Sequence, residues 1–433
     1  MADRSKFPPV FWVANLIELL ERYAYYGIYF GFGIYLASLG YSRDQLGIVQ
    51  SLFLFFSYLI PVVSGTFADR YGFKKVLIAA YLAYIPAILL LLATKSFSGI
   101  AAAMLCIGFA AGIFKPLIAG TVRLTTDSSN ATLGFGIFYA IVNVGASFGP
   151  IVAGKLRAIS WDYAFMSSAI AVSLMFVITL LFYEEPPRNA DVQPLRSKLR
   201  DILTTLSDVK FGSFLVLLGL FFWLPLWGFF NLCALYVDSA LDGAQLYRGL
   251  DAGLSWIPVV GPWLVGLVSH DVDGARRVLG ESVSHTGYMI ILLQLPVSVV
   301  FERFRALPSF IFGLAVAGAG FVVIGLAATG HAALVFLGIA LFAIGEMITS
   351  PRIQEYITWI APKEKAGLYM GSNFLGTMIG ATLSGIYAPL YGYFERIGHP
   401  GGVWFVLAGH MALAVLVFIA FVRLAGEFKV QSE

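Results

Sequence analysis

Hydrophobic residues in this chain gather into long runs of about 20 residues, separated by short polar segments. As an α-helix, a run of that length crosses a bilayer core of roughly 30 Å. Twelve spans can be placed, and they cover residues 10–38, 46–67, 75–95, 98–122, 133–154, 161–183, 212–237, 284–301, 308–329, 332–360, 367–393 and 402–424. The pattern predicts an all-α polytopic membrane protein.

Two longer polar stretches divide the spans. Residues 184–211 are charged and contain prolines, as a linker between two six-helix halves, 1–183 and 212–433, would be. A second stretch, about 239–283, falls inside the C-terminal half and is expected to form an extracytoplasmic insertion. Its apolar run 256–264 is too short and too interrupted to cross the membrane, so we expect an interfacial or re-entrant segment there.

Composition and charge support this organisation. A chain that is 59% hydrophobic and 12% charged has too little polar surface for a soluble protein of 433 residues. Flanking Lys and Arg residues divide seventeen to eight, which predicts a multi-pass protein of the cell (inner) membrane with both termini and the linker cytoplasmic. Cys106 and Cys233 lie in apolar runs and suggest no disulfide framework.

Five ionisable residues fall deep inside the predicted spans, where each is costly. Glu18, Glu21 and Arg22 share one face of the first span, because residues three and four apart are neighbours on a helix. Lys115 lies in the fourth span and Glu346 in the tenth. Three anions against two cations leave one carboxylate under-compensated, which favours proton coupling; a fully paired structural network is the alternative.

Two six-helix halves joined by a cytoplasmic linker resemble the major facilitator fold, and residues 65–75 resemble the loop signature of that superfamily. Asp69 and Arg70 would then form a conformational latch, with an ordinary basic loop as the alternative. In this fold spans 1, 4, 7 and 10 line a central cavity, and the five deep charges lie only in spans of that set. Arg352 and Glu355, near the cytoplasmic end of span 10, are expected to form an ion pair or gate.

Six motifs, in order, resemble those of proton-dependent oligopeptide transporters. They lie at residues 18–27, 58–61, 112–116, 138–146, 345–351 and 361–371. The resemblance suggests a divergent 12-helix member of that family. It implies that Glu18, Glu21, Arg22 and Glu346 couple protons. It also implies that Arg22 and Lys115 bind the substrate carboxylate, while Glu346 receives the amino group.

The resemblance also predicts further pocket residues. Some match the family's motifs, and others stand where this chain differs from them. Pocket-lining roles are implied for Tyr25, Tyr26, Tyr58 and Asn143. Where the family has an Arg, a span-7 Glu and a span-11 Trp, this chain has Tyr29, Trp227 and Asn373. The Arg–Glu pair closes the outer side in the family, so here aromatic packing is expected to replace it. Trp223 and Asn231 complete the expected substrate-binding set.

These observations predict a proton-coupled symporter for small peptides or peptide-like zwitterions, working by alternating access around a midplane cavity. Charges of opposite sign at two ends of a cavity suit a zwitterion, because each end replaces lost hydration. Two alternatives are a transporter or exporter of another amphiphile and a non-transporting receptor. We expect a monomer in the lipid bilayer with no nucleic-acid partner, no metal, no cofactor beyond the coupling proton and no enzymatic activity, since no nucleophile–base set is apparent.

Overall fold

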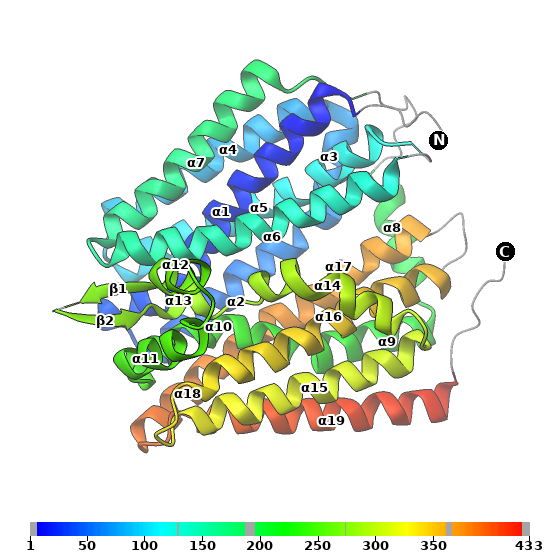
Figure 1. The fold of residues 1–433 in the computed structure, drawn as a ribbon. Helices are drawn as coiled ribbons and strands as arrows, with labels where there is room; N and C mark the ends of the chain where they lie inside the picture. The colour runs from blue at the N-terminus through cyan, green and yellow to red at the C-terminus, as the bar shows by residue number, and fades with distance from the viewer. Residues whose placement is uncertain (1–6, 128–129, 187–194, 273, 361–365, 427–433) are drawn as a thin grey trace. The chain divides into compact units, whose positions relative to one another are not determined.

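The computed structural model describes residues 7–127, 130–186, 195–272, 274–360 and 366–426 (Figure 1). Its contacts divide the chain into two compact units. Unit 1 comprises Met1–Phe32 and Leu52–Arg200, and unit 2 comprises Gly33–Ser51 and Asp201–Glu433. The end of the first helix and the start of the second therefore group with the C-terminal helices.

Unit 1 is a bundle of long apolar helices. Its elements are α1 (Pro9–Ser38, as far as residue 32), α2 (Arg43–Leu59, from residue 52), α3 (Pro61–Tyr71), α4 (Phe73–Ala93), α5 (Phe97–Leu124), α6 (Ala131–Arg157) and α7 (Trp161–Phe182). Helix α4 packs against both α5 and α7. Helices α2 and α3 form one span bent by 41° at Ile60. The bend precedes Pro61, which has no backbone N–H to continue the helical ladder.

Unit 2 contains the C-terminal helices. They are α9 (Val209–Leu218), the π turn η1 (Gly219–Trp223), α10 (Leu224–Ala240), α14 (Gly287–Phe301), α15 (Ala306–Ala327), α16 (Leu334–Ile360), α17 (Ala366–Leu383), the 3-10 turn η3 (Ser384–Ile386), α18 (Tyr387–Arg396) and α19 (Gly402–Ala425). Helix α15 packs between α16 and α19. In its core, the rings of Phe229 and Phe342 stack with centroids 3.9 Å apart.

The described helices agree with the predicted spans. Nine of them are long and apolar enough to cross a membrane, and the bent pair α2–α3 makes a tenth. Helix α1, with its three buried charges, and the interrupted helix α17–η3–α18 occupy the two other predicted positions. The all-α, polytopic prediction is confirmed.

The polar stretch within unit 2 folds into short elements. Helices α11 (Gly243–Leu254) and α12 (Val260–Val268) precede a hairpin of β1 (Ser269–Val272) and β2 (Ala275–Val278), and then α13 (Gly280–Val283) leads into α14. The strands pair antiparallel with Ser269 opposite Val278. Trp256 and Trp263 are largely exposed around the turn into α12. An interfacial position for this turn stays a prediction.

The predicted linker also contains regular structure. Helix α8 (Leu195–Leu206) occupies its middle, and α9 begins before its end. The Asp208 carboxylate accepts the backbone N–H groups of Lys210 and Phe211 at the start of α9, as an N-cap residue does. Residues 187–194 of the linker lie outside the described residues.

Candidate functional site

A buried charge cluster occupies one face of α1. The side chains of Glu18, Glu21 and Arg22 are 1%, 0% and 9% exposed. Arg22 Nε lies 2.6 Å from Glu18 Oε1 and 3.2 Å from Glu21 Oε2. Within the described part of the chain, neither Glu21 oxygen accepts a hydrogen bond, and neither does Glu18 Oε2. One guanidinium group therefore serves two buried carboxylates.

Lys115 brings a second cation to this cluster from α5. Its Nζ donates to the backbone carbonyl of Ser57 at 3.3 Å and lies 4.1 Å from the Tyr58 ring centroid and 4.9 Å from that of Tyr25. The ammonium acts electrostatically on both Glu18 and Glu21. Aromatic faces and a carbonyl thus hold the charge, and no carboxylate of the described residues forms an ion pair with it.

The residue after Lys115 explains how α5 is held at this point. Pro116 has no N–H, so the carbonyl of Gly112 loses its usual partner within the helix. The Ser64 hydroxyl of α3 donates to that carbonyl at 3.4 Å. This contact fixes α3 against α5 one turn from the Lys115 side chain.

The tyrosines predicted to line the pocket form one aromatic group in unit 1. The Tyr25 ring meets those of Tyr26 and Tyr29 at centroid distances of 5.1 and 5.9 Å. Tyr29, where the resemblance expects an Arg, is buried and stacks on Phe53 at 5.0 Å. This position is therefore occupied by aromatic packing within the unit.

Helix α6 crosses α1 directly behind the cluster. A methyl group at Gly145 would lie 2.6 Å from the Leu19 carbonyl and 2.7 Å from Arg22 Cβ, so only glycine allows this approach. Asn143 is buried on the same helix, and its Nδ2 donates to the carbonyl of Tyr139 at 2.9 Å. Within the described part of the chain, Asn143 forms no hydrogen bond with the charged residues.

The loop between α3 and α4 contains the predicted latch. Asp69 lies in the last turn of α3, and the exposed Arg70 guanidinium lies 5.5 Å from the Tyr71 ring. The N-terminus of α4 is bound by Glu185, whose carboxylate accepts the N–H groups of Phe73 at 2.6 Å and Lys74 at 3.0 Å. Sequence reasoning placed Glu185 in the linker and gave it no role.

In unit 2 the predicted pocket residues of span 7 lie along η1 and α10. Trp223 ends the π turn, and Trp227 lies beside Phe230 with ring centroids 5.6 Å apart. The Asn231 amide donates to Ser384 Oγ at 2.8 Å, which joins α10 to η3. Asn231 therefore has a structural role, because it holds two elements of this unit together.

Four other predicted residues lie on α16 and α17. The Oε2 atom of Glu346 on α16 is buried and accepts no hydrogen bond from the described residues. Arg352 and Glu355 form an ion pair at 2.6 Å, and Arg352 also donates to the Phe304 carbonyl at 3.2 Å. Asn373 is buried on α17.

Comparison with known proteins decides the family. Residues 14–280 match the family model of the Major Facilitator Superfamily, well over half of the chain. The chain belongs to the major facilitator superfamily. It is 22% identical over 403 residues to the uncharacterized MFS-type transporter YqjV of Bacillus subtilis (strain 168), covering 90% of this chain and 87% of that protein. It is 23% identical to the quinolone resistance protein NorA of Staphylococcus aureus, over 36% of this chain and 40% of that protein.

Solved structures agree with the major facilitator fold. A POT family transporter in complex with 5-aminolevulinic acid matches with a TM-score of 0.65 and 20% identity, covering 95% of each chain. The nucleoside transporter NupG matches with a TM-score of 0.74 and 13% identity, covering 95% of this chain and 99% of that one. This major facilitator is therefore a multi-pass membrane protein, and membrane transport is its general function.

One group of contacts in this major facilitator was not foreseen from the sequence. Within unit 2, the Arg43 guanidinium at the start of α2 binds Glu395 of α18 through two hydrogen bonds of 2.7 and 2.9 Å. Gln50 Nε2 donates to the Asn231 carbonyl at 3.0 Å, and Gly47 touches the Gly385 backbone. Segment 33–51, called here the α1–α2 tip, is thus fastened to the C-terminal helices.

Proposed function

We propose that this major facilitator is a proton-coupled symporter that carries small peptides or peptide-like zwitterions by alternating access. The observation that carries the proposal is the buried cluster on α1, in which Glu18 and Glu21 share Arg22 while Lys115 acts on both carboxylates from α5. Its chemistry suits both a coupling proton and an anionic end of a substrate.

The carboxylates are the proposed proton sites. Burying an ion pair is costly, and a buried carboxylate without full hydrogen bonding gains when it takes up a proton. Glu21 meets this description, because Arg22 gives its shorter contact to Glu18 and no described residue donates a hydrogen bond to Glu21. Protonation of Glu21 would leave Arg22 with one carboxylate partner instead of two.

Lys115 and Arg22 are the proposed anchors for a substrate carboxylate. The ammonium of Lys115 is held by rings and one carbonyl, so an incoming carboxylate would provide its first close anionic partner. Glu346, with one buried oxygen still able to accept a hydrogen bond, is the proposed partner of a substrate amino group. Tyr25, Tyr26 and Tyr58 would line the site around Lys115 and Arg22 in unit 1.

Relatives with known ligands support this choice of substrate class. A POT family transporter has been solved with 5-aminolevulinic acid, and another POT family transporter with a thioalcohol conjugated peptide. Both ligands are small molecules of the kind that can present an amino group and a carboxylate together. The motifs at 18–27, 112–116 and 345–351 resemble those of the same family.

The test is uptake into proteoliposomes. With an inward proton gradient, the wild type should accumulate dipeptides or 5-aminolevulinic acid. Glu21→Gln should abolish this accumulation but retain substrate exchange, and Lys115→Gln should raise KM at least tenfold. Lys95→Gln is the matched control, because its ion pair with Asp162 is exposed and the variant should behave as wild type. Normal accumulation against a gradient by both cluster variants would refute the coupling assignment.

A second candidate function is transport or export of another amphiphile. The observation favouring it is the aromatic character of positions 29 and 227, where Tyr29 stacks on Phe53 and Trp227 packs on Phe230. Thermal-shift screening separates the two functions, because only ligands of the native state stabilise it. Stabilisation by aromatic cations and none by dipeptides would favour the second function. Absence of flux with every stabilising ligand would favour a receptor.

A further inference from the structure

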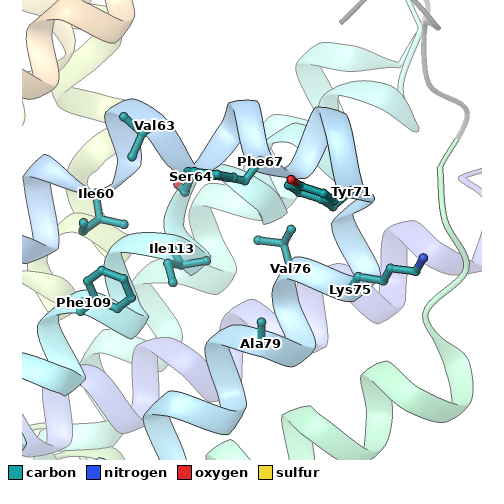
Figure 2. Close-up of a pocket in the computed structure, with 10 residues that line it drawn as sticks. All are labelled: Ile60, Val63, Ser64, Phe67, Tyr71, Lys75, Val76, Ala79, Phe109 and Ile113. Atoms are coloured by element: carbon teal, nitrogen blue, oxygen red, sulfur yellow. The ribbon is translucent and has the colours of Figure 1, made fainter. Parts of the chain in front are cut away.

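Unit 1 contains an apolar groove, and no residue of the charge cluster lines it. It lies between α3, α4 and α5, has a volume of about 490 Å³, and is shown in Figure 2. Phe67 of α3 and Phe109 of α5 line it and are 44% and 42% exposed, so the groove opens outward. Ala79 lines its α4 wall.

The walls of this groove provide hydrocarbon and almost no hydrogen bonding. Its lining residues include two hydroxyl groups, those of Ser64 and Tyr71. The Ser64 hydroxyl already donates to the Gly112 carbonyl. Helices α4 and α5 are membrane-spanning by length and composition, and α3 completes a bent span. A groove of this kind within the bilayer is complementary to an acyl chain.

One end of the groove is cationic. Lys75 and Tyr71 line it beside the α3–α4 loop, and the Arg70 guanidinium lies 5.5 Å from the Tyr71 ring. In the described part of the chain neither Arg70 nor Lys75 forms an ion pair. Both side chains are exposed at the end of a membrane span, where a lipid headgroup lies.

The other charged groups of this loop are engaged or lie on another element. Lys74 Nζ donates to the Leu180 carbonyl at 3.0 Å. The Glu185 carboxylate is bound to the N-terminus of α4. Asp69, in the last turn of α3, is half-buried and is the remaining anion of the loop. The exposed charge at the groove end is therefore positive.

We propose that this groove binds an anionic phospholipid, with one acyl chain along Phe67, Phe109 and Ile113 and the phosphate at Lys75 and Arg70. The proposal rests on one juxtaposition: the groove is apolar, and two cations without ion-pair partners lie at its headgroup end. Near the membrane surface, each Lys or Arg contributes about 1 kcal/mol to the attraction of anionic lipids. Removing either cation should weaken binding about fivefold.

The experiment measures binding of phosphatidylglycerol and phosphatidylcholine with identical acyl chains to the purified, delipidated protein by native mass spectrometry. We expect the wild type to prefer phosphatidylglycerol at least tenfold. Arg70→Gln/Lys75→Gln should reduce that preference below threefold, Lys75→Arg should retain it, and Lys95→Gln, an exposed cation elsewhere, should leave it unchanged. Equal preference in the wild type and the double variant would overturn the headgroup assignment.

A second variant tests the acyl-chain part. Ala79→Phe places a ring in the groove from its α4 wall, so it should reduce binding of both lipids while the melting temperature stays within a few degrees of wild type. Undiminished lipid binding in this variant would overturn the groove as the site. Because the readout is lipid binding, failure here is distinguishable from failure of the proposed transport function.

Discussion

Breaking the ion pair between Arg43 and Glu395 should loosen the α1–α2 tip. The two hydrogen bonds are 2.7 and 2.9 Å long, and the side chains are 18% and 25% exposed. A neutral replacement, Glu395→Gln, loses the charge but keeps the shape. Hydrogen bonds to charged groups contribute about 1.5–3 kcal/mol when buried, and exposed ion pairs less than ~1 kcal/mol. For this partly exposed bidentate pair we expect a loss of about 1–2 kcal/mol.

Hydrogen–deuterium exchange of the tip measures this loss directly. Amides of residues 39–47 exchange when the tip opens, and about 1–2 kcal/mol corresponds to exchange roughly 5–30 times faster. Arg43→Gln should give a similar increase. The double variant should add little to either single change, because the two residues act as one pair.

A matched control separates this pair from a general effect of removing charge. Asp162→Asn breaks the ion pair with Lys95 in unit 1, where the nitrogen–oxygen distance is 3.2 Å and the side chains are 49% and 61% exposed. It should change exchange of the tip less than about twofold. The reasoning is refuted if Glu395→Gln and Asp162→Asn give the same exchange rates.

Two further changes test other contacts. Glu185→Gln should lower the free energy of unfolding by about 1 kcal/mol, because two N–H groups at the start of α4 lose a charged acceptor. A thermal-shift assay should show a lower melting midpoint, and an unchanged midpoint would argue against the cap. Gly47→Ala should speed exchange of the tip, since the methyl meets the Gly385 carbonyl, whereas Gly65→Ala meets nothing within 4 Å and should be neutral.

Local patterns in the sequence were sufficient for the helices and for part of the site. Apolar runs specify spans because each helix satisfies its own backbone hydrogen bonds in lipid. Glu18, Glu21 and Arg22 are within four residues of one another, so their shared face follows from the helix period alone. Lys115 was selected because a charge within an apolar run is conspicuous.

Long-range contacts were beyond those patterns. Arg43 and Glu395 are 352 residues apart, and each looks like an ordinary charge beside a span. Glu185 was indistinguishable from the other linker charges, because its partner, the N-terminus of α4, is backbone and leaves no mark in composition. Aromatic packing of Tyr29 and Trp227 was expected, and each residue does pack on rings within its own unit. Their part in closing the outer side stays a prediction.

The unbroken length of α1 has a mechanical consequence. The helix runs from Pro9 to Ser38 with no proline after its first residue, and it contains the charge cluster near its middle and the start of the α1–α2 tip at its end. From Glu21 to Ser38 the lever arm is about 25 Å, so a tilt of about 5° about Glu21 displaces the far end by about 2 Å. That displacement is enough to break a hydrogen bond such as the one from Gln50. Rearrangement around one carboxylate can thus be amplified at the tip by rigid rotation alone.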